Sequence, residues 1–234
     1  MMKKGKTLLA VLLMLISVVA SASVKIVPEP VEIHEYSGKF TLPSEVTISD
    51  FRDGKMVDTY IELSSKILKT KGVALKKGGK NSTVKLSISK KIKGEGEYII
   101  EVGKRDIRIQ AADEDALWCG LQTLTQLLFQ GVDRQMVIRD EPRFGYRGAM
   151  LDCCRHFFSV EDVKSFIDMM AVHKLNRFHW HLTEDQGWRI EIKKYPRLTE
   201  IGSVRESTYM TNYSGEQCDS FVDKPYGGFY TQDD

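Results

Sequence analysis

The chain has few cysteines and prolines, no excess of either charge and no apolar run long enough for a comfortable membrane span. It contains four cysteines and six prolines in 234 residues, with 34 basic residues against 32 acidic ones. A chain with nearly equal numbers of basic and acidic residues lacks the excess of positive charge expected of proteins that bind nucleic acid or anionic membranes. This charge balance excludes neither an enzyme nor a binding module, and it suits a protein whose ligand is neutral.

The longest apolar run lies at the N-terminus. Three lysines precede the run from Leu8 to Val19, which is followed by the small residues 20–22. This order is typical of a cleaved secretory signal, and the run is shorter than the roughly 20 residues that a membrane span needs. We expect residues 1–22 to be removed and the protein to be exported, periplasmic or extracellular, with no stable membrane span after cleavage. The remaining charges are 31 basic and 32 acidic.

The cysteines do not form the pattern of a disulfide framework, although export would permit one. Cys153 and Cys154 are adjacent in a run that predicts a strand, Cys119 lies in an apolar helical stripe, and Cys218 falls in a loop. We expect buried free thiols, with Cys218 as the exposed exception.

The first part of the chain combines strands and helices. Alternating runs predict strands at 83–89, 97–102 and 106–111, and a turn at Gly103-Lys104 would make the last two a hairpin. Helices are predicted from Asp58 to Lys71, with Asp58 as N-cap, and from Asp113 to Gly131. Residues 23–141 are therefore predicted to form a small α+β domain with its helices on one side of a sheet.

The pattern changes after Asp140-Glu141, which precede a proline and predict a solvated turn. A strand over 147–154, a helix capped by Ser159 with Asp162, and a strand over 177–182 follow. This order is a βαβ unit with parallel strands, and the residues from Ser203 predict a long loop. We expect residues 142–234 to be the start of a (β/α)8 TIM barrel. They are too few for a complete barrel, which has about 250 residues.

Charged and imidazole side chains gather where the two predicted strands end. Asp152 and Arg155 precede two phenylalanines, a combination that suits a sugar but also fits a structural ion pair. His179 and His181 share a strand face, and continued alternation would add Asp185. Their chemistry fits a proton-transfer network. A metal-dependent hydrolase built on these two histidines is an alternative, but further ligands are not evident. Either histidine could also be a packed core residue.

Residues 142–202 closely resemble the start of the catalytic barrel of family 20 glycoside hydrolases, the β-N-acetylhexosaminidases. The helix Gly120-Leu-Gln-Thr-Leu-Thr-Gln-Leu-Leu128 also resembles one in the small domain that precedes the barrel in that family. The matching barrel stretches are Pro142-Arg-Phe, Arg147-Gly, Leu151-Asp152, Arg155-His156-Phe157, Lys174-Leu-Asn176, His179-Trp-His181-Leu-Thr, Asp185-Gln-Gly-Trp-Arg189 and Glu191-Ile-Lys-Lys-Tyr-Pro196.

The resemblance implies roles for individual residues. Arg155 would bind hydroxyls of a terminal N-acetylhexosamine, supported by Asp152 and His156. His181, Glu184 and Asp185 would belong to an acidic and imidazole layer behind the general acid. The family often has two aspartates where this chain has Glu184-Asp185, so either carboxylate could take the supporting role. Trp188 would line the sugar pocket or pack at its rim.

The resemblance also implies a reaction. It is retaining hydrolysis of terminal N-acetyl-β-hexosamine residues in glycans, assisted by the substrate's acetamide group, without a metal or cofactor. The catalytic Asp-Glu pair of that family follows a later barrel strand. Asp113-Glu114 and Asp140-Glu141 do not follow a barrel strand. We therefore expect no catalytic residues within this chain, the pair lying beyond Asp234, and no hydrolysis by these residues alone. The alternative is a non-catalytic sugar-binding remnant.

Overall fold

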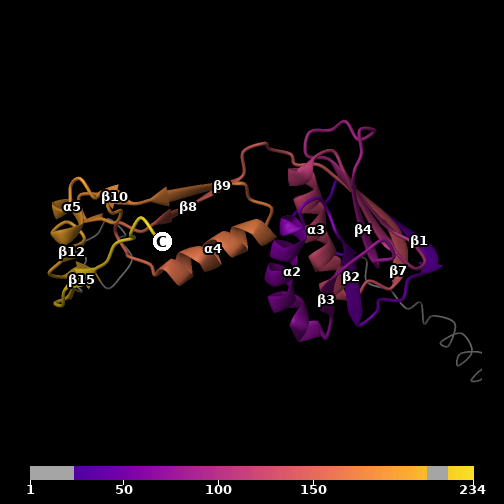
Figure 1. The fold of residues 1–234 in the computed structure, drawn as a ribbon, viewed down its shortest axis with the longest axis horizontal. Coiled ribbons are helices and arrows are strands. Elements are labelled where there is room, and N and C mark those ends of the chain that lie inside the picture. The colour runs from indigo at the N-terminus through magenta and orange to yellow at the C-terminus, as the bar shows by residue number, and fades with distance from the viewer. Residues whose placement is uncertain (1–23, 210–220) are drawn as a thin grey trace, which may run out of the picture.

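A computed structural model describes residues 24–209 and 221–234. The predicted signal at 1–22 and the predicted exposed Cys218 lie outside these residues. In Figure 1 a helix-covered sheet occupies one end of an elongated molecule, and a βαβ unit with a cluster of short hairpins occupies the other. None of the helices within the described ranges combines the length and the apolar character that crossing a membrane requires.

A seven-stranded mixed sheet forms the N-terminal part. Its spatial order is β1-β7-β5-β6-β4-β2-β3, antiparallel from β1 to β6 and parallel from β6 to β3. The strands are β1 (Glu32–Lys39), β2 (Glu45–Ser49), β3 (Ala74–Gly78), β4 (Val84–Ile88), β5 (Tyr98–Val102), β6 (Ile107–Ala111) and β7 (Arg134–Asp140). The predicted hairpin is confirmed as the antiparallel pair β5–β6, with Ile100 opposite Ile109.

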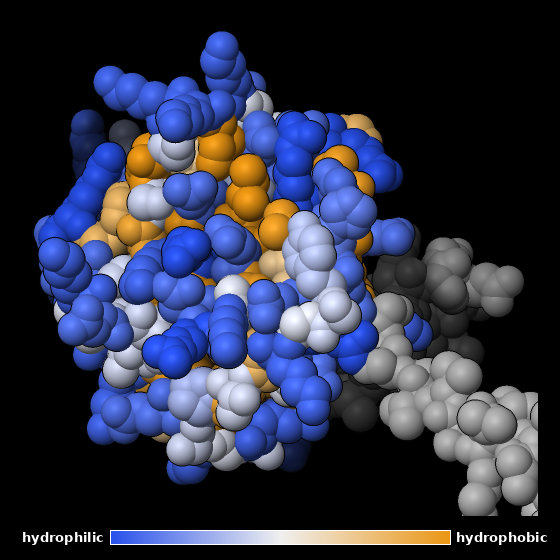
Figure 2. Space-filling view, turned by 90° about the vertical axis from the view of Figure 1, so that its right-hand side faces the viewer, coloured by the Kyte–Doolittle hydropathy of each residue, from blue (hydrophilic) through white to orange (hydrophobic). Residues whose placement is uncertain are grey.

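Two helices, α2 (Lys55–Leu68) and α3 (Glu114–Gln130), cover one face of this sheet (Figure 1). Alternate strand residues such as Tyr98, Ile100 and Val102 are buried in one core with them. Figure 2 views the molecule from the side on which the sheet lies, and hydrophilic side chains dominate there, with hydrophobic ones between them. A core on one side of the sheet is what the α+β prediction for this domain requires, and the prediction is confirmed.

The two helices begin differently. Asp113 caps α3 by accepting a hydrogen bond from the Ala116 amide at 2.8 Å, and Gly131 ends the helix in the left-handed region with φ 72°. The predicted cap of α2 at Asp58 is wrong. That helix begins three residues earlier, directly after Gly54 at φ 78°, a conformation that favours glycine. The Asp58 carboxylate instead accepts a hydrogen bond from Lys77. A 3-10 turn, η1 (Lys69–Lys71), then leads to the predicted stop at Gly72.

The predicted βαβ unit is present. It comprises β8 (Gly148–Asp152), α4 (Val160–Val172) and β9 (Arg177–His181), and β8 pairs with β9 in parallel, placing Asp152 opposite His181. Ser159 and Asp162 form the predicted capping box of α4. Phe178 and Trp180 are partly buried and pack against a small core that includes Val163 of α4. Val163 and Met170 of α4 are buried, whereas Ile167 is 44% exposed.

Short elements follow β9, and two antiparallel strand pairs occur in the described part of the segment after Ser203, where a long loop is predicted. The hairpin β10 (Thr183–Glu184) and β11 (Gly187–Trp188) directly follows β9, and the helix α5 (Arg197–Glu200) comes next. Two further antiparallel pairs are β12 (Val204–Arg205) with β15 (Tyr226–Gly227), and β13 (Thr208–Tyr209) with β14 (Phe221–Val222). These pairs bring distant parts of the segment back against the turn that follows β8.

A buried polar contact joins the two parts of the molecule. Lys174 Nζ donates to Tyr98 OH at 2.8 Å and to Asp140 Oδ2 at 3.2 Å, while Tyr98 OH donates to Asp140 Oδ2 at 2.5 Å. Lys174 and Asp140 are both buried. The prediction of a solvated turn at Asp140 is therefore wrong, because Asp140 ends β7 with its carboxylate enclosed by the Lys174 amine and the Tyr98 hydroxyl.

Candidate functional site

The candidate site lies at the C-terminal ends of β8 and β9. The polypeptide turns immediately after Asp152, so Cys153 and Cys154 lie in that turn and not on the strand where the sequence pattern placed them. Asp152 Oδ1 accepts hydrogen bonds from the amides of Cys154 at 3.0 Å and Arg155 at 3.1 Å. An aspartate that binds amides ahead of it in sequence stabilises such a turn. Asp152 thereby fixes the direction in which Arg155 leaves the backbone.

Two carboxylates hold the guanidinium group of Arg155. Its Nη1 lies 2.5 Å from Asp152 Oδ2, and its Nη2 lies 2.7 Å from Glu184 Oε2. The Arg155 side chain is nevertheless 56% exposed, whereas those of Asp152 and Glu184 are 22% and 14% exposed. A guanidinium group has five N–H donors in a fixed fork. The two partly buried acids therefore orient Arg155, and its solvent-exposed N–H donors stay available to a ligand.

The charges of this pair reinforce each other. Burial raises the pKa of Asp152, but the amide and guanidinium donors of Arg155 and the Cys154 amide outweigh it and hold the pKa below its usual range. The hydrogen bond to Asp152 raises the pKa of Arg155, assisted by the charges of Asp152, Glu184 and Asp185. Both groups are therefore ionised at neutral pH.

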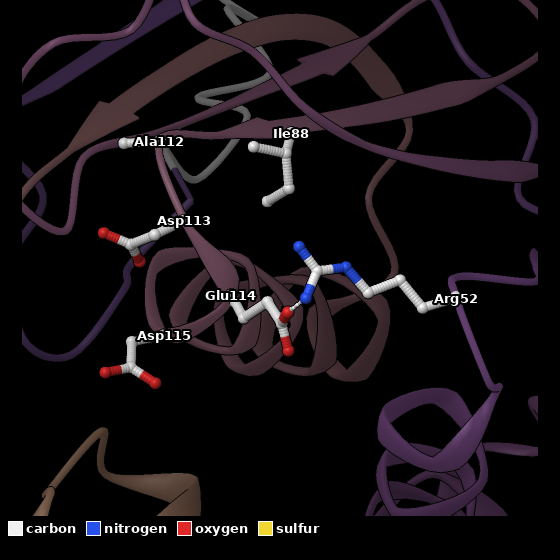
Figure 3. A pocket seen from close by; sticks show the side chains of 6 residues that line it. All are labelled: Arg52, Ile88, Ala112, Asp113, Glu114 and Asp115. Atoms are coloured by element: carbon white, nitrogen blue, oxygen red, sulfur yellow. Dashed lines mark ion pairs between the residues drawn. The ribbon is translucent and has the colours of Figure 1, made fainter.

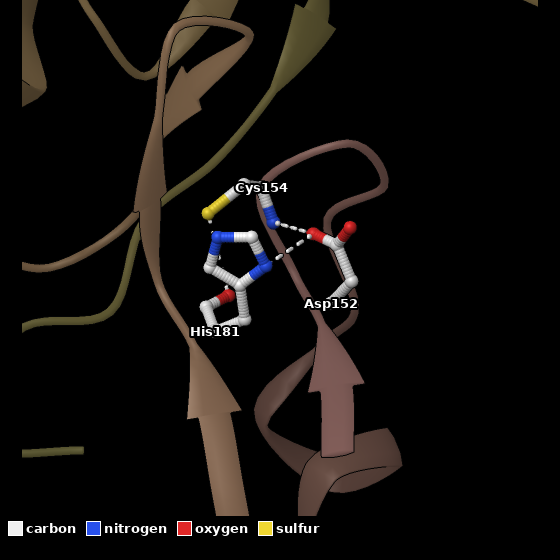
Figure 4. A group of neighbouring side chains, drawn as sticks. All are labelled: Asp152, Cys154 and His181. Atoms are coloured by element: carbon white, nitrogen blue, oxygen red, sulfur yellow. Dashed lines mark hydrogen bonds and ion pairs between the residues drawn. The ribbon is translucent and has the colours of Figure 1, made fainter.

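His181 and Cys154 lie on the other side of Asp152 (Figure 4). His181 Nδ1 is 3.5 Å from Asp152 Oδ1, and the Cys154 thiol donates to the His181 carbonyl oxygen at 3.3 Å. Burial raises the pKa of the Cys154 thiol to about 12, helped by the charges of Asp152 and Glu184. The thiol is therefore protonated at neutral pH, and the cluster combines an imidazole, a thiol and a carboxylate.

The remaining predicted residues are placed less centrally. The exposed His156 packs its ring against Phe158 and Tyr226, with ring centroids 4.9 and 5.2 Å away. Trp188 is partly buried and its indole N–H donates to the Ile190 carbonyl oxygen at 2.8 Å. The rings of His179 and His181 are 6.2 Å apart. Among the described residues, the group with metal-ligand spacing is Asp152, Cys154 and His181, so His179 is not part of it.

Glu184, and not Asp185, contacts Arg155. Strict alternation along β9 would have placed Asp185 on the same side as the imidazoles. The strand ends at His181, however, and the hairpin β10–β11 changes which side chains face the site. Asp185 is exposed, while Glu184 reaches Arg155 from the first strand of the hairpin. Of the two candidate carboxylates, Glu184 is therefore the one that contacts Arg155.

Arg189 is a structural residue of the site whose role the sequence did not reveal. It is fully buried, and its guanidinium group donates to the carbonyl oxygens of Cys153 at 3.0 Å, Cys154 at 2.9 Å and Gly228 at 3.1 Å, and to that of Ser203. Burial lowers the pKa of Arg189. Arg189 thus connects the turn that carries Arg155 to the loops on both sides of the β12–β15 pair.

Gly187 makes room for this arginine. A Cβ added at Gly187 would lie 2.5 Å from Arg189 Nη2 and 2.6 Å from its Cζ. The sequence signal for this arrangement is the glycine two residues before the arginine in Gln-Gly-Trp-Arg. The role of this glycine can be understood only from the folded structure, in which four backbone carbonyl oxygens surround the Arg189 guanidinium group.

The β12–β15 pair packs over the same turn. Arg205 Nη2 donates to the Arg155 carbonyl oxygen at 2.6 Å, and the Tyr226 hydroxyl accepts from the Phe157 amide at 2.9 Å. The Tyr230 hydroxyl donates to the Phe158 carbonyl oxygen at 2.7 Å. The segment 155–158 is therefore held by three side chains from later in the chain, and the side chains of Arg155 and His156 remain exposed.

A separate hollow lies in the N-terminal part, at the start of α3. It is lined by Arg52, Ile88 and the segment 112–115, and Arg52 forms an ion pair with Glu114 there (Figure 3). The acidic residues around it include Asp113, which already caps the helix. An acidic helix start paired with an arginine is explained by helix capping and dipole stabilisation.

Comparison with known protein families divides the chain in two. Residues 23–141 match the model for "Glycosyl hydrolase family 20, domain 2", and residues 144–234 match that for "Glycosyl hydrolase family 20, catalytic domain". A β-hexosaminidase of Porphyromonas gingivalis is 38% identical over 226 residues, covering 90% of this chain and 27% of the relative. One of Vibrio vulnificus is 34% identical over 220 residues, covering 92% of this chain and 25% of the relative.

Solved structures give the same result. The exo-β-N-acetylglucosaminidase of Vibrio harveyi, solved in complex with N-acetylglucosamine, is 33% identical with a TM-score of 0.74, over 89% of this chain and 32% of that one. A β-N-acetylhexosaminidase of Bacteroides fragilis is 30% identical with a TM-score of 0.68, over 90% of this chain and 41% of that one. The chain spans about a quarter of the length of the Porphyromonas gingivalis and Vibrio vulnificus relatives.

Proposed function

Because this chain belongs to glycosyl hydrolase family 20, we propose that it forms the sugar-holding part of a β-N-acetylhexosaminidase. In this proposal, residues 23–141 are the small accessory domain. Residues 142–234 begin a (β/α)8 barrel, with β8 and β9 as its first two strands. The reaction would release terminal N-acetylhexosamine from glycans outside the cytoplasm, after removal of the signal at 1–22.

The main support for this function is that Arg155 forms ion pairs with both Asp152 and Glu184 and yet remains exposed. A buried structural arginine satisfies its donors within the protein, as Arg189 does with four carbonyl oxygens. Arg155 is different because more than half of its side chain remains exposed. Preorganised donors of this kind suit the hydroxyl groups of a sugar, which accept hydrogen bonds in fixed directions.

Each neighbour has a defined part in this proposal. Asp152 stabilises the turn and the protonated form of Arg155. Glu184 pairs with the second terminal nitrogen of the guanidinium group. His181, held against Asp152, belongs to the supporting layer next to the reacting end of the sugar. His156 and its aromatic neighbours shape the rim. The solved Vibrio harveyi relative contains N-acetylglucosamine, which supports that sugar as the first ligand to test.

The chemistry in this proposal is substrate-assisted. The acetamide oxygen of the sugar attacks its own anomeric carbon, and water then opens the intermediate with retention of configuration. This needs a carboxylate to orient the acetamide and a carboxylic acid to protonate the departing oxygen. The Asp-Glu pairs at 113–114 and 140–141 occur at a helix start and at the end of β7, neither beside Arg155. We therefore expect these 234 residues to bind the sugar without hydrolysing it.

Two measurements on the purified protein test this function. Calorimetric titration is expected to detect binding of N-acetylglucosamine. A chromogenic N-acetylglucosaminide is expected to remain intact in the same sample. Turnover of that compound would contradict the proposed division of labour, while absence of sugar binding would favour an inert remnant.

A further inference from the structure

The end of the βαβ unit brings together a second set of chemically matched donors. The ligand atoms of Asp152, Cys154 and His181 all lie within 4.8 Å of one another. They come from the ends of β8 and β9 and from the turn that follows β8, and Asp152 and His181 are direct register partners. Figure 4 shows the imidazole ring between the thiol and the carboxylate. The backbone, and not chance contact of long side chains, therefore sets this arrangement.

This donor set is selective. Imidazole nitrogen, thiolate sulfur and carboxylate oxygen are the ligands of zinc, at about 2.0–2.3 Å from the metal. A tetrahedral cation at those distances would bring the donors to roughly 3.5 Å from each other, so on binding the side chains would have to move closer than their present separations of up to 4.8 Å. Sulfur also favours soft cations over magnesium or calcium, which take oxygen ligands.

The surroundings supply negative charge and an entry path. Asp152 and His181 keep 22% and 26% of their side chains exposed, although Cys154 is buried. Glu184 faces the same region, and its Oε1 is a buried atom with no hydrogen-bond partner among the residues that the structure describes. Opposing these groups is the positive charge of Arg155, which is bound to the same Asp152 carboxylate. A cation here would therefore compete with Arg155 for Asp152.

We propose that Asp152, Cys154 and His181 bind a thiophilic divalent cation, zinc or cadmium, and that this cation antagonises sugar binding at Arg155. On binding, the Cys154 thiol releases its proton to solvent, its hydrogen bond to the His181 carbonyl oxygen breaks, and a sulfur–metal bond forms. The cation then neutralises Asp152 and repels the Arg155 guanidinium group. The metal site stands independently, whereas the antagonism rests on the proposed sugar-binding function.

The chain provides its own control for the metal site. Cys153 is also buried and adjacent, but its sulfur accepts a hydrogen bond from the Trp180 indole at 3.2 Å and is not part of the cluster. Titration of the purified protein with Cd²⁺ is followed by the ultraviolet absorption of the cadmium–thiolate bond. We expect saturable binding that survives Cys153→Ser and weakens by more than about 10-fold in Cys154→Ser. No thiolate band, or a band that persists in Cys154→Ser, would overturn the assignment.

A second measurement does not depend on the fold of a variant. X-ray absorption at the zinc edge of the zinc-loaded unmodified protein is expected to show one sulfur among nitrogen and oxygen neighbours. A shell of nitrogen and oxygen alone would overturn the site even if Cys154→Ser fails to fold.

Calorimetry with N-acetylglucosamine tests the antagonism. Zinc is expected to weaken sugar binding at least about 10-fold in the unmodified protein and to have no effect in Cys154→Ser. Unchanged affinity in zinc-loaded protein would overturn the antagonism. If the metal-free protein does not bind the sugar, the proposed function fails and the antagonism with it, while the metal site is decided by the cadmium and zinc spectra.

Discussion

Arg155 Nη2 lies 2.7 Å from Glu184 Oε2, an ion pair that connects the turn after β8 to the hairpin after β9. The contact joins two segments that are well separated in sequence and come together only because β8 and β9 are neighbours. It also distinguishes Glu184 from Asp185, which is exposed. The orientation of Arg155 therefore depends on a carboxylate from the second strand as well as on Asp152 from its own.

Glu184→Gln should weaken N-acetylglucosamine binding, because the amide keeps the shape of the side chain but loses the charge that fixes Arg155. We expect a drop of roughly 2- to 5-fold, as for loss of one ion pair worth up to about 1 kcal/mol. Calorimetric titration measures it, and Asp185→Asn is the matched control with an expected change below about 2-fold. A larger effect from Asp185→Asn would mean that the wrong carboxylate has been assigned.

The buried Lys174–Asp140 pair should contribute strongly to the stability of the junction between the two parts. Lys174→Met leaves the Asp140 carboxylate buried without its cation, and we expect a loss of about 3 kcal/mol in the free energy of unfolding. The double variant with Asp140→Asn should lose less than the sum of the two single changes. Denaturant unfolding of all four proteins gives this coupling, and strictly additive losses would refute the pairing.

Arg189 should be irreplaceable by lysine. Four backbone carbonyl groups converge on its planar guanidinium group, whereas a lysine ammonium has three donors on one compact nitrogen and cannot reach all four. We expect Arg189→Lys and Arg189→Met each to lower the free energy of unfolding by about 3 kcal/mol or more, since buried carbonyl oxygens lose partners. Thermal unfolding measures this, with Arg197→Met on exposed α5 as the control. Full stability of Arg189→Lys would contradict this account.

Glu97 should contribute to stability only while it is ionised. The hydrogen bond from Arg139 at 2.6 Å is the main cause that lowers its pKa, with the Gly94 amide assisting against the effect of burial. A lowered pKa in the folded state stabilises the protein above the unfolded value of about 4.3, and this contribution disappears as pH falls through the folded value.

The corresponding measurement compares the unmodified protein with Glu97→Gln across acid pH. We expect the variant to be less stable at pH 7 and the difference to shrink to nothing at the acid end. Glu101→Gln, at an exposed position paired with Arg108, should show a smaller difference at pH 7. A Glu97→Gln difference that is constant with pH would show that the ionised carboxylate is not the cause.

Much of the fold near the site could be predicted because it depends on local pattern. The apolar runs and the Ser159 cap predict the βαβ unit, and the polar residues at the strand ends follow directly. β1 could not be predicted in the same way. Its alternating residues are only partly buried, and its place in the sheet is set by pairing with β7, about 100 residues later along the chain.

The supporting contacts of the site depend on contacts between distant segments. Periodicity along β9 predicts Asp185 beside the histidines, but the β10–β11 hairpin ends that alternation and presents Glu184. The partners of Arg189 lie at 153, 154, 203 and 228, and only the folded loops bring them together. Local sequence pattern identified which strand ends carry chemistry, while tertiary packing decided which side chains support Arg155.

The central claim is that Arg155 is a ligand-binding arginine and not merely a structural one. Calorimetric titration of N-acetylglucosamine into Arg155→Ala tests it most directly, with the exposed Arg177→Ala on β9 as the control. The account predicts that Arg155→Ala lowers affinity by roughly 10- to 100-fold, as expected when hydrogen bonds to a charged donor are lost, while Arg177→Ala binds like the unmodified protein. Equal affinity in the unmodified protein and in Arg155→Ala would contradict it.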